Sequence, residues 1–457
     1  MKNNSALGSG LKQRHLTMMS VAGVIGATLF VGSGKVIAQA GPATILAYML
    51  GASLVVLIMR MLGEMAVATP DTGTFSTYAD KAIGPWAGFT VGWLYWWFWV
   101  LVLPIEANIA GTIINTWNPE IPVWVVALVM TSLLTITNLF DVRNFGEFEF
   151  WFGLIKVIAI IAFMILGSLA IFGLLPGSQV SGIEFLTEPS GFMPNGFSAV
   201  LGAMLGTMLI FMGAEVVTLA ASETENPAQQ IIRSVKAVVW RICLFYVGSI
   251  FIVICLVPWN DPRLPVVGAY QRVLELMNVP YAAPIIQFVV LTSVASCFNS
   301  ALFTASRMLY SLSRRGDGPK LTSQTSKNGV PIAAVLMSSA VGFVAVVANY
   351  TAPAEVFSVL MSSTGSIALM VYLVIAFSQL SMRRKLEAAG HTFQLKMWLF
   401  PWLTLTVITF IFSVLIIMII RPEYRIEVGT TSILAIFLIV AGVIRQRSAK
   451  NLATTSN

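Results

Sequence analysis

The chain has 457 residues, of which 57% are hydrophobic and only 10% are charged, and its mean hydropathy is +0.83. A soluble domain carries about 25% charged residues. Apolar runs of about 20 residues, each long enough to cross the hydrocarbon core of a membrane, recur from end to end. The composition therefore excludes a soluble enzyme, a secreted disulfide scaffold and a disordered chain. The net charge of +7 comes from basic residues at the ends of the apolar runs, so we expect no nucleic-acid partner.

The apolar runs predict an all-α integral membrane protein with twelve membrane-spanning helices. The loops between the runs are too short to hold a soluble catalytic domain. The predicted spans cover residues 16–39, 43–66, 85–114, 122–140, 148–174, 197–222, 237–258, 282–312, 331–350, 354–378, 398–420 and 430–446.

Lysine and arginine residues predict the orientation of these spans. Cytoplasmic loops of membrane proteins are enriched in both residue types, and twelve spans collect nearly all of them on one side. The exceptions are Lys156, which lies inside a span, and the residues on the opposite side, Lys35, Arg263, Arg272, Arg421 and Arg425. We therefore expect both termini in the cytoplasm, with short tails at 1–15 and 447–457.

Two predicted spans contain interruptions. The first has glycines at positions 23, 26, 32 and 34, and the sixth has Gly213 close to the carboxylate of Glu215. Each glycine weakens a helix by about 1 kcal/mol relative to alanine, and freed backbone groups are tolerated in a membrane where they line a cavity. Interrupted helices at the first position of two five-helix halves are typical of inverted-repeat transporters. The alternative is close packing of helices through small residues, which explains Gly32 and Gly34 well.

Three ionisable residues lie at membrane depth: Glu106 in the third span, Lys156 in the fifth and Glu215 in the sixth. A charge at the bilayer centre costs at least about 2.5–3.5 kcal/mol on insertion scales, so its presence indicates a function. Lys156 is a candidate proton carrier or a fixed substitute for a bound cation, unless its side chain extends to the inner surface. Glu215 has the alternative role of capping the amides of a broken helix, and Glu106 that of a protonated packing residue.

The sequence does not indicate enzymatic or metal chemistry. The only histidines, His15 and His391, lie at the start of a span and in a cytoplasmic loop, where neither forms a buried triad or a metal site with other residues. The cysteines, Cys243, Cys255 and Cys297, fall inside apolar runs and are typical of small packing residues. We expect no enzyme activity, no metal site and no organic cofactor.

Five segments carry a resemblance to a known family. They are GVIGATLFVGSG (23–34), GEMAVATPDTGTFSTYA (63–79), FGEFEFWFGLIKV (145–157), FMGAEVVTLAASETENP (211–227) and SRMLYSLSRRGDGP (306–319). In these segments and in their order, the chain resembles the amino-acid permeases of the amino acid–polyamine–organocation superfamily over its whole length. Within that family it looks most like the bacterial γ-aminobutyrate (GABA) permeases, on the first and fourth segments and on GWLYWWFWVLVLPIEANIAG (92–111).

The resemblance implies a LeuT-like fold of two inverted five-helix repeats followed by two extra helices. The corresponding parts of this chain are 16–194 for the first repeat, 195–378 for the second and 379–446 for the last two helices.

The resemblance also implies the site residues. The unwound segment of the first helix, which binds the substrate carboxylate through backbone amides, matches Ile25, Gly26, Ala27 and Thr28. The break in the sixth helix, whose carbonyls accept hydrogen bonds from the substrate ammonium, matches Phe211, Gly213 and Ala214. Many α-amino-acid permeases have a second glycine where this chain has Thr28, which is consistent with a reshaped pocket.

Proton coupling is the other implication of the resemblance. Lys156 matches a lysine that occupies the place of a sodium ion in related sodium-coupled transporters, which favours protons over sodium. We expect Lys156, Glu215 and Glu106 to couple substrate movement to proton movement, with no metal. The expected substrate is a small zwitterionic amino acid, and the expected assembly is a monomer or weak homo-oligomer among membrane lipids.

Our main hypothesis is a proton-coupled transporter that imports GABA or a related ω-amino acid across the bacterial inner membrane by alternating access. The alternatives within the family are a permease for neutral or aromatic α-amino acids or proline, and a diamine permease. From other classes, a nutrient receptor built on a transporter fold usually carries a long cytoplasmic extension, and a channel needs rings of like residues along a polar path. The sequence shows neither feature.

Overall fold

The computed structural model describes residues 13–22, 25–71, 73–140, 142–186, 191–221, 226–351 and 364–455. Within these ranges every regular element is a helix and no β-strand occurs. Nine helical segments in the described part of the chain are long and apolar enough to cross a membrane: Ser33–Ala68, Pro85–Trp117, Phe145–Ile171, Pro227–Leu256, Ala282–Arg314, Ile332–Thr351, Ser366–Ala388, Trp402–Ile420 and Tyr424–Ser448. Two shorter apolar helices cover Val123–Asn138 and Gly196–Met208.

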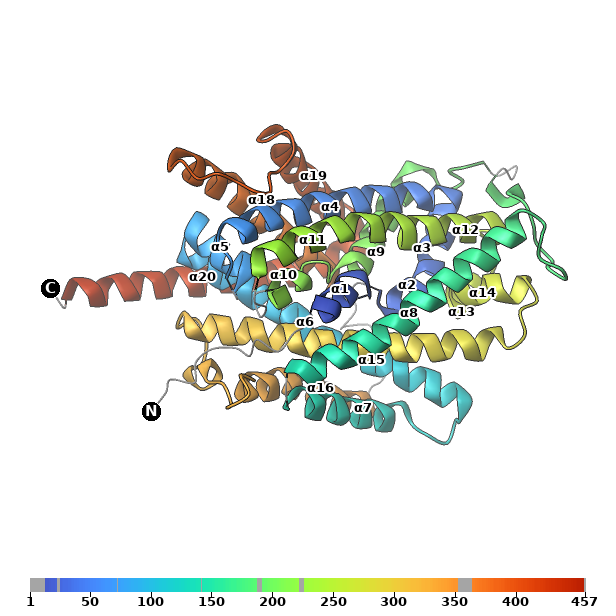
Figure 1. Ribbon diagram of the computed structural model, residues 1–457, viewed down its shortest axis with the longest axis horizontal. Helices are drawn as coiled ribbons and strands as arrows, with labels where there is room; N and C mark the ends of the chain where they lie inside the picture. Colours follow the sequence, from blue (N-terminus) through green and yellow to red (C-terminus); the bar gives the residue numbers. More distant parts are fainter. Residues whose placement is uncertain are drawn as a thin grey trace.

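The individual elements are labelled in Figure 1. In chain order they are α1 (Gln13–Ala22), α2 (Ala27–Phe30), α3 (Ser33–Ala40), η1 (Gly41–Ala43), α4 (Thr44–Ala68), α5 (Thr74–Ala82), α6 (Pro85–Trp117), α7 (Val123–Asn138), α8 (Val142–Ile171), η2 (Glu184–Leu186), α9 (Gly196–Phe211), α10 (Val216–Ala221), α11 (Pro227–Arg241), η3 (Ile242–Gly248), α12 (Ser249–Leu256), α13 (Leu264–Val267), α14 (Ala269–Leu276), α15 (Ala282–Arg314), η4 (Lys320–Ser323), α16 (Ile332–Thr351), α18 (Gly365–Ala388), α19 (Trp402–Ile420) and α20 (Pro422–Thr455).

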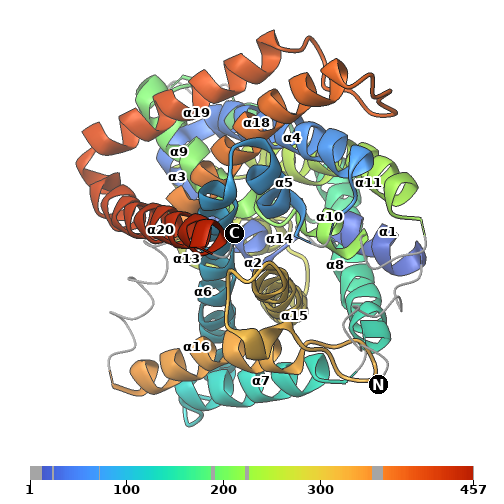
Figure 2. The same cartoon turned by 90° about the vertical axis from the view of Figure 1, so that its left-hand side faces the viewer.

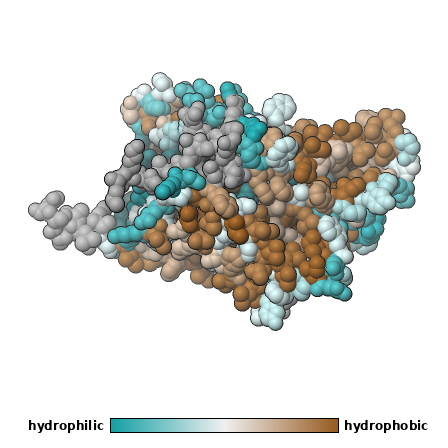
Figure 3. Space-filling view, turned by 60° about the horizontal axis from the view of Figure 1, so that its bottom comes forward, coloured by the Kyte–Doolittle hydropathy of each residue, from teal (hydrophilic) through white to brown (hydrophobic). Residues whose placement is uncertain are grey.

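The long helices run roughly along the longest axis of the molecule (Figure 1). The short helices α13 and α14 lie at one end of this bundle, and α5 and the end of α20 lie at the other. Figure 3 shows a broad hydrophobic band on the surface, with hydrophilic patches towards the ends. An apolar band between polar ends is the surface that a lipid bilayer requires.

Helix α8 shows how the sequence separates a lipid-facing side from an interior side. Trp151, Ile158 and Ile165 are spaced by seven residues and are 60%, 58% and 56% exposed. Glu149 and Lys156, also seven residues apart, are each 1% exposed. Because seven residues make two helical turns, each set occupies one face, and the ionisable set faces the protein.

Helix α15 lies close to the centre of the bundle in the end-on view, next to α6 (Figure 2). Its polar residues Ser293, Ser296, Asn299 and Ser300 are all buried. Their spacing of three and four residues places them on one side of the helix. This polar stripe inside the bundle provides hydrogen-bonding groups at membrane depth.

Several boundaries differ from those predicted. Helix α20 continues to Thr455, so the predicted tail at 447–457 is helical over most of its length. Helix α8 begins at Val142, ahead of the predicted start at 148. The predicted spans 16–39 and 354–378 each include positions, 23–24 and 354–363, that lie outside the described residues.

Candidate functional site

The first candidate element is the interruption between α1, which ends at Ala22, and α2, which begins at Ala27. Gly26 has φ −92° and ψ 175°, an extended conformation that does not belong to a helix. The first amides of a helix have no intrahelical acceptor, and they carry a partial positive charge. Gly26, Ala27 and Thr28 thus offer backbone N–H groups inside the bundle, where α2 lies in Figure 2.

The carbonyl of Ile25 at this interruption is held by two other helices. Lys156 Nζ on α8 donates to it over 2.9 Å, and Ser293 Oγ on α15 donates over 3.0 Å. Lys156 is 1% exposed. The alternative that this lysine extends to the membrane surface is therefore wrong, and its ammonium group contacts the segment predicted to bind substrate.

A buried carboxylate completes this network, and the sequence analysis missed it. Lys156 Nζ also donates to Ser296 Oγ over 3.0 Å, and Ser296 Oγ donates to Glu149 Oε2 over 2.8 Å. Asn299 Nδ2 donates to Glu149 Oε1 over 3.2 Å, and Asn138 Nδ2 on α7 donates to Asn299 Oδ1 over 2.7 Å. The seven-residue spacing from Lys156 is the sequence signal that places Glu149 on the same face of α8.

The second interruption lies between α9, which ends at Phe211, and α10, which begins at Val216. Gly213 has φ +110°, a conformation that L side chains rarely adopt. Its amide donates to both oxygens of the Glu215 carboxylate at 3.2 Å, and Tyr95 Oη donates to Glu215 Oε1 over 3.0 Å. Glu215 therefore satisfies a backbone amide within the interruption of its own helix.

A small internal cavity of about 40 Å³ lies between these elements. Its wall includes Gly26, Thr28, Phe98, Trp99, Val102, Ile105, Glu106, Ile210, Met212, Cys297 and Ser300. This volume holds at most a few water molecules. The surrounding side chains therefore fill most of the space between the two interruptions. Among the predicted residues Gly26, Thr28 and Glu106 line this cavity.

The other predicted residues lie outside its wall. Ile25 and Ala27 are the chain neighbours of Gly26. Phe211 lies in the sequence between Ile210 and Met212, which both line the cavity. Gly213 and Ala214 follow within the second interruption.

Two polar atoms near the cavity have no hydrogen-bond partner within the described residues: Glu106 Oε2 and Trp99 Nε1. Buried polar atoms are nearly always hydrogen-bonded, and each exception needs an explanation. Since both side chains line the cavity, a bound polar molecule would provide the missing partner.

A larger cavity of about 290 Å³ shares Thr28 with the small one. It is lined in addition by Lys35 and Gln39 of α3, Gly202 of α9, and Tyr424 and Glu427 of α20. We interpret it as the approach to the centre from the side of α3.

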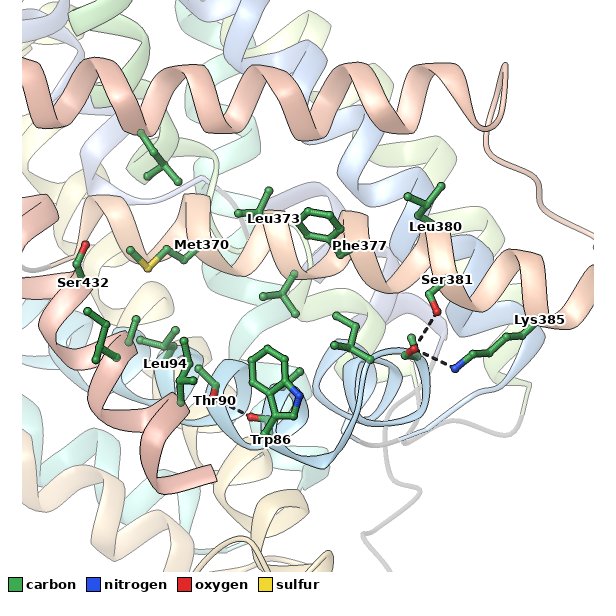
Figure 4. Close-up of a pocket in the computed structure, with 18 of the residues that line it drawn as sticks. Trp86, Thr90, Leu94, Met370, Leu373, Phe377, Leu380, Ser381, Lys385 and Ser432 are labelled. Atoms are coloured by element: carbon green, nitrogen blue, oxygen red, sulfur yellow. Dashed lines mark hydrogen bonds between the residues drawn. The ribbon is translucent and has the colours of Figure 1, made fainter. Parts of the chain in front are cut away.

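A third and separate cavity of about 910 Å³, which we call the flank pocket, lies where α6, α18 and α20 meet (Figure 4). Its wall is mostly apolar, with Trp86, Leu94, Leu373, Phe377 and Ala435 among its residues. None of the predicted site residues lines it. The flank pocket is therefore distinct from the candidate transport site.

The family described as "Amino acid permease" matches residues 15–453 of the chain. The chain belongs to the amino acid permease family. This permease is thus a membrane transporter and not an enzyme. It is 58% identical to the "Probable GABA permease" of Pseudomonas aeruginosa, over 99% of this chain and 95% of that protein. It is 59% identical to the "Gamma-aminobutyric acid permease" of Escherichia coli, over 97% of this chain and 95% of that protein.

A more distant relative is named for a different class of substrate. The aromatic amino acid transport protein of Corynebacterium glutamicum is 38% identical to this permease. The match covers 98% of the permease chain and 97% of the relative. Among solved structures, a manganese transporter of Eremococcus coleocola superposes with a TM-score of 0.59 at 12% identity, over 97% of this chain and 96% of that one. The structural likeness concerns the fold alone.

Proposed function

We propose that this permease imports GABA or a related ω-amino acid, together with a proton, across the bacterial inner membrane by alternating access. The names and high identities of the relatives support GABA over an aromatic α-amino acid. The observation that carries the coupling is the hydrogen bond from Lys156 Nζ to the Ile25 carbonyl. Through it, a change in the charge of one side chain acts directly on the segment that binds substrate.

In our proposal the substrate carboxylate binds the backbone amides of Gly26, Ala27 and Thr28 at the start of α2. A helix N-terminus favours an anion through its N–H groups and its dipole. The substrate ammonium binds Glu106 Oε2, together with the backbone carbonyls of the second interruption at Phe211, Gly213 and Ala214. The unpartnered Glu106 oxygen in the cavity wall supports this placement.

Proton coupling begins at Lys156 in this scheme. The protonated amine donates to the Ile25 carbonyl and holds the first interruption in place. Loss of the proton removes a charge-assisted hydrogen bond and frees the segment between α1 and α2 to move. The carboxylate of Glu106 interacts with the positive charge of the substrate ammonium. Glu215 maintains the shape of the second interruption through its hydrogen bonds with the Gly213 amide. No metal ion or organic cofactor takes part.

The finer architecture is part of the same proposal: twelve spans in a 5+5 inverted repeat with two more helices. The segment Ser33–Ala68 joins the second half of the first predicted span to the second span, and the two shorter apolar helices match the fourth and sixth. Both termini would face the cytoplasm, and the permease would act as a monomer or weak homo-oligomer among the lipids.

The test uses purified permease in liposomes, with radiolabelled GABA outside and an inward proton gradient without sodium. We expect uphill GABA uptake that a protonophore abolishes. Competition with unlabelled β-alanine, proline, phenylalanine and putrescine then defines the substrate class. Uptake of an α-amino acid without GABA uptake would overturn the substrate assignment, and GABA binding without any transport would favour a receptor.

A further inference from the structure

Glu149 on α8 is a buried carboxylate that the proposed function does not use. It is 1% exposed and lies seven residues before Lys156. At 1.5 Å per residue, this separation is about 10 Å along the helix. Glu149 is nearer than Lys156 to Val142, where α8 begins. The distribution of basic residues assigns this end of the helix to the cytoplasmic side. In that predicted orientation, Glu149 lies between Lys156 and the cytoplasm.

Two hydrogen bonds link Lys156 to Glu149 through Ser296, and in both of them the group nearer to Lys156 is the donor. Lys156 Nζ donates to Ser296 Oγ over 3.0 Å, and Ser296 Oγ donates to Glu149 Oε2 over 2.8 Å. A hydroxyl group both donates and accepts, so Ser296 joins the amine to the carboxylate in a continuous chain. From the amine to the carboxylate, each group in this chain donates a hydrogen bond to the next.

The surroundings of this chain hold Glu149 in position. Asn299 Nδ2 donates to its other oxygen, and Asn299 is itself held by Asn138 of α7. Among the described residues, the titratable groups whose charge acts on Lys156 include Glu149 on its own helix, Cys297 on α15 and Glu106 on α6. Of the two carboxylates, Glu149 is the one joined to Lys156 through a hydrogen-bonded hydroxyl group, and Glu106 is the one in the cavity wall.

We propose that Glu149 receives the transported proton from Lys156 through Ser296 and releases it to the cytoplasm. This inference rests on the proposed proton-coupled function. In the step, Lys156 Nζ gives a proton to Ser296 Oγ while the Ser296 hydroxyl proton passes to Glu149 Oε2. The amine ends neutral, the hydroxyl is restored and the carboxyl group is protonated. The deprotonated Lys156 then holds the Ile25 carbonyl less strongly, so proton release and opening of the first interruption occur together.

The test compares two kinds of transport in the same liposomes. Net uphill uptake driven by a proton gradient needs proton release, whereas exchange of labelled for unlabelled GABA across the membrane does not. We expect Glu149→Gln to lower uphill uptake by roughly a hundredfold, the scale of losing one proton-transfer group, while exchange stays close to that of the wild type. Ser296→Ala should show the same pattern, and Ser296→Thr, which keeps the hydroxyl, should restore uphill uptake.

Glu147→Gln is the matched control, because Glu147 lies on the same helix but is half-exposed and pairs with Arg14 and His15. It should leave proton-driven uptake unchanged. Normal uphill uptake in Glu149→Gln, or an equal loss of uptake and exchange in both the Glu149 and Ser296 variants, would overturn the relay. A wild-type protein that shows no proton-driven GABA uptake would instead overturn the proposed function.

The flank pocket carries a second inference, independent of the transport site. It measures about 910 Å³, within the range of pockets that enclose small molecules, and its wall is mostly apolar. Figure 4 shows Ser381 and Lys385 at one end of the pocket and Ser432 towards the other. Arg384 also lines it, and both basic side chains are exposed. The pocket therefore combines a long apolar wall with positive charge at one end.

We infer that the flank pocket binds a phospholipid with an anionic head group, its acyl chain along α6 and α18 and its phosphate at Arg384 and Lys385. Within the described part of the chain no carboxylate pairs with either residue. Lys385 Nζ donates to the carbonyls of Ala82 and Lys81 at 3.0 and 3.2 Å, and an ammonium group has three protons, so one donor remains. Basic pockets between membrane helices on the cytoplasmic side suit anionic head groups.

Native mass spectrometry of the permease with phosphatidylglycerol, phosphatidylcholine or soluble glycerophosphate tests this site. We expect retention of phosphatidylglycerol over the other two. The double variant Arg384→Gln/Lys385→Gln should reduce this preference by about fivefold for each charge removed. Ala435→Phe, which fills the apolar part, should reduce binding of the lipid without changing the charge. The exposed Arg447→Gln is the control. Equal retention of phosphatidylcholine, or an equal loss in the control, would overturn the inference.

Discussion

The two interrupted helices of this permease satisfy their freed backbone groups in different ways. At the first interruption, the Ile25 carbonyl accepts hydrogen bonds from Lys156 of α8 and Ser293 of α15. At the second, the Gly213 amide donates to Glu215, which follows two residues later. The first interruption is held by other helices, and the second is held largely by its own sequence.

This difference assigns different tasks to the two interruptions. Freed backbone groups in a membrane protein must be satisfied in every state. A group satisfied by other helices changes its partners when those helices move or when a partner loses its charge. A group satisfied by a nearby residue keeps its partner as its helix moves. We therefore expect the first interruption to respond to protonation and the second to keep its shape.

The largest expected effect follows from removing the charged partner of the first interruption. Lys156→Ala should lower uphill GABA accumulation by roughly a hundredfold or more, because both the charge and the hydrogen bond to Ile25 are lost. Lys156→Arg, which keeps a charge that is never released, should lose accumulation but retain exchange. Uptake in liposomes measures both, and size-exclusion chromatography checks folding. Normal accumulation in Lys156→Ala would refute the coupling role.

The second interruption should respond in stability rather than in coupling. Glu215→Ala removes the acceptor of the Gly213 amide and of the Tyr95 hydroxyl, and leaving buried donors unsatisfied costs about 1–3 kcal/mol. We expect a lower unfolding temperature in detergent and an unchanged pH dependence of the remaining uptake. Tyr95→Phe, which removes one donor and leaves the Gly213 bond, should have a smaller effect. An altered pH dependence with normal stability would make Glu215 a coupling group.

The sequence was enough to predict both interruptions and the ionisable residues at membrane depth. A glycine close to a carboxylate in the middle of a span, or a lysine within an apolar run, is rare in membrane proteins. Each of these features could therefore be predicted from a single position in the sequence. Glu149 was missed because the predicted span began at 148, which placed it at the membrane surface. The helix begins at Val142 instead, and this brings Glu149 two turns into the bundle.

The pairing of Glu149 with its hydrogen-bond partners was beyond the reach of the sequence for a different reason. Ser296 and Asn299 are about 150 positions away from Glu149 along the chain, and only the packing of α15 against α8 brings them together. The cavity wall was also only partly predicted. Adjacent side chains point in different directions, so Ile210 and Met212 line the cavity while Phe211 between them does not.

Glycine substitutions in the two interruptions should have smaller effects that still distinguish the first interruption from the second. A Cβ atom on Gly26 would lie 3.4 Å from Thr28 Oγ1 and 3.8 Å from Cys297 Sγ, which are ordinary contacts. Gly26→Ala should therefore fold normally, but its methyl group enters the small cavity and should raise the KM for GABA by about tenfold. Gly213→Ala, at φ +110°, should lower stability instead. Equal thermal stability of the two variants would contradict the distinction.

The smallest expected effect concerns Ser293, the neutral partner of Ile25. Ser293→Ala removes one hydrogen bond worth about 1 kcal/mol, which is about a fivefold weakening of GABA binding, while Lys156 still holds the carbonyl. Thr304→Val is the control, because the Thr304 hydroxyl bonds within α15 to the carbonyl of Ser300. Binding of labelled GABA by scintillation proximity gives the affinity of each variant without requiring transport.

A double-mutant cycle then asks whether the two donors act on the same carbonyl. If they do, Ser293→Ala should weaken binding more in the Lys156→Ala background than alone, because the Ile25 carbonyl then loses both of the side-chain donors found among the described residues. Interacting residues in one network typically show coupling of about 0.5–3 kcal/mol. Purely additive effects would mean that the first interruption is not held through this carbonyl, and the contrast between the two interruptions would then rest on Glu215 alone.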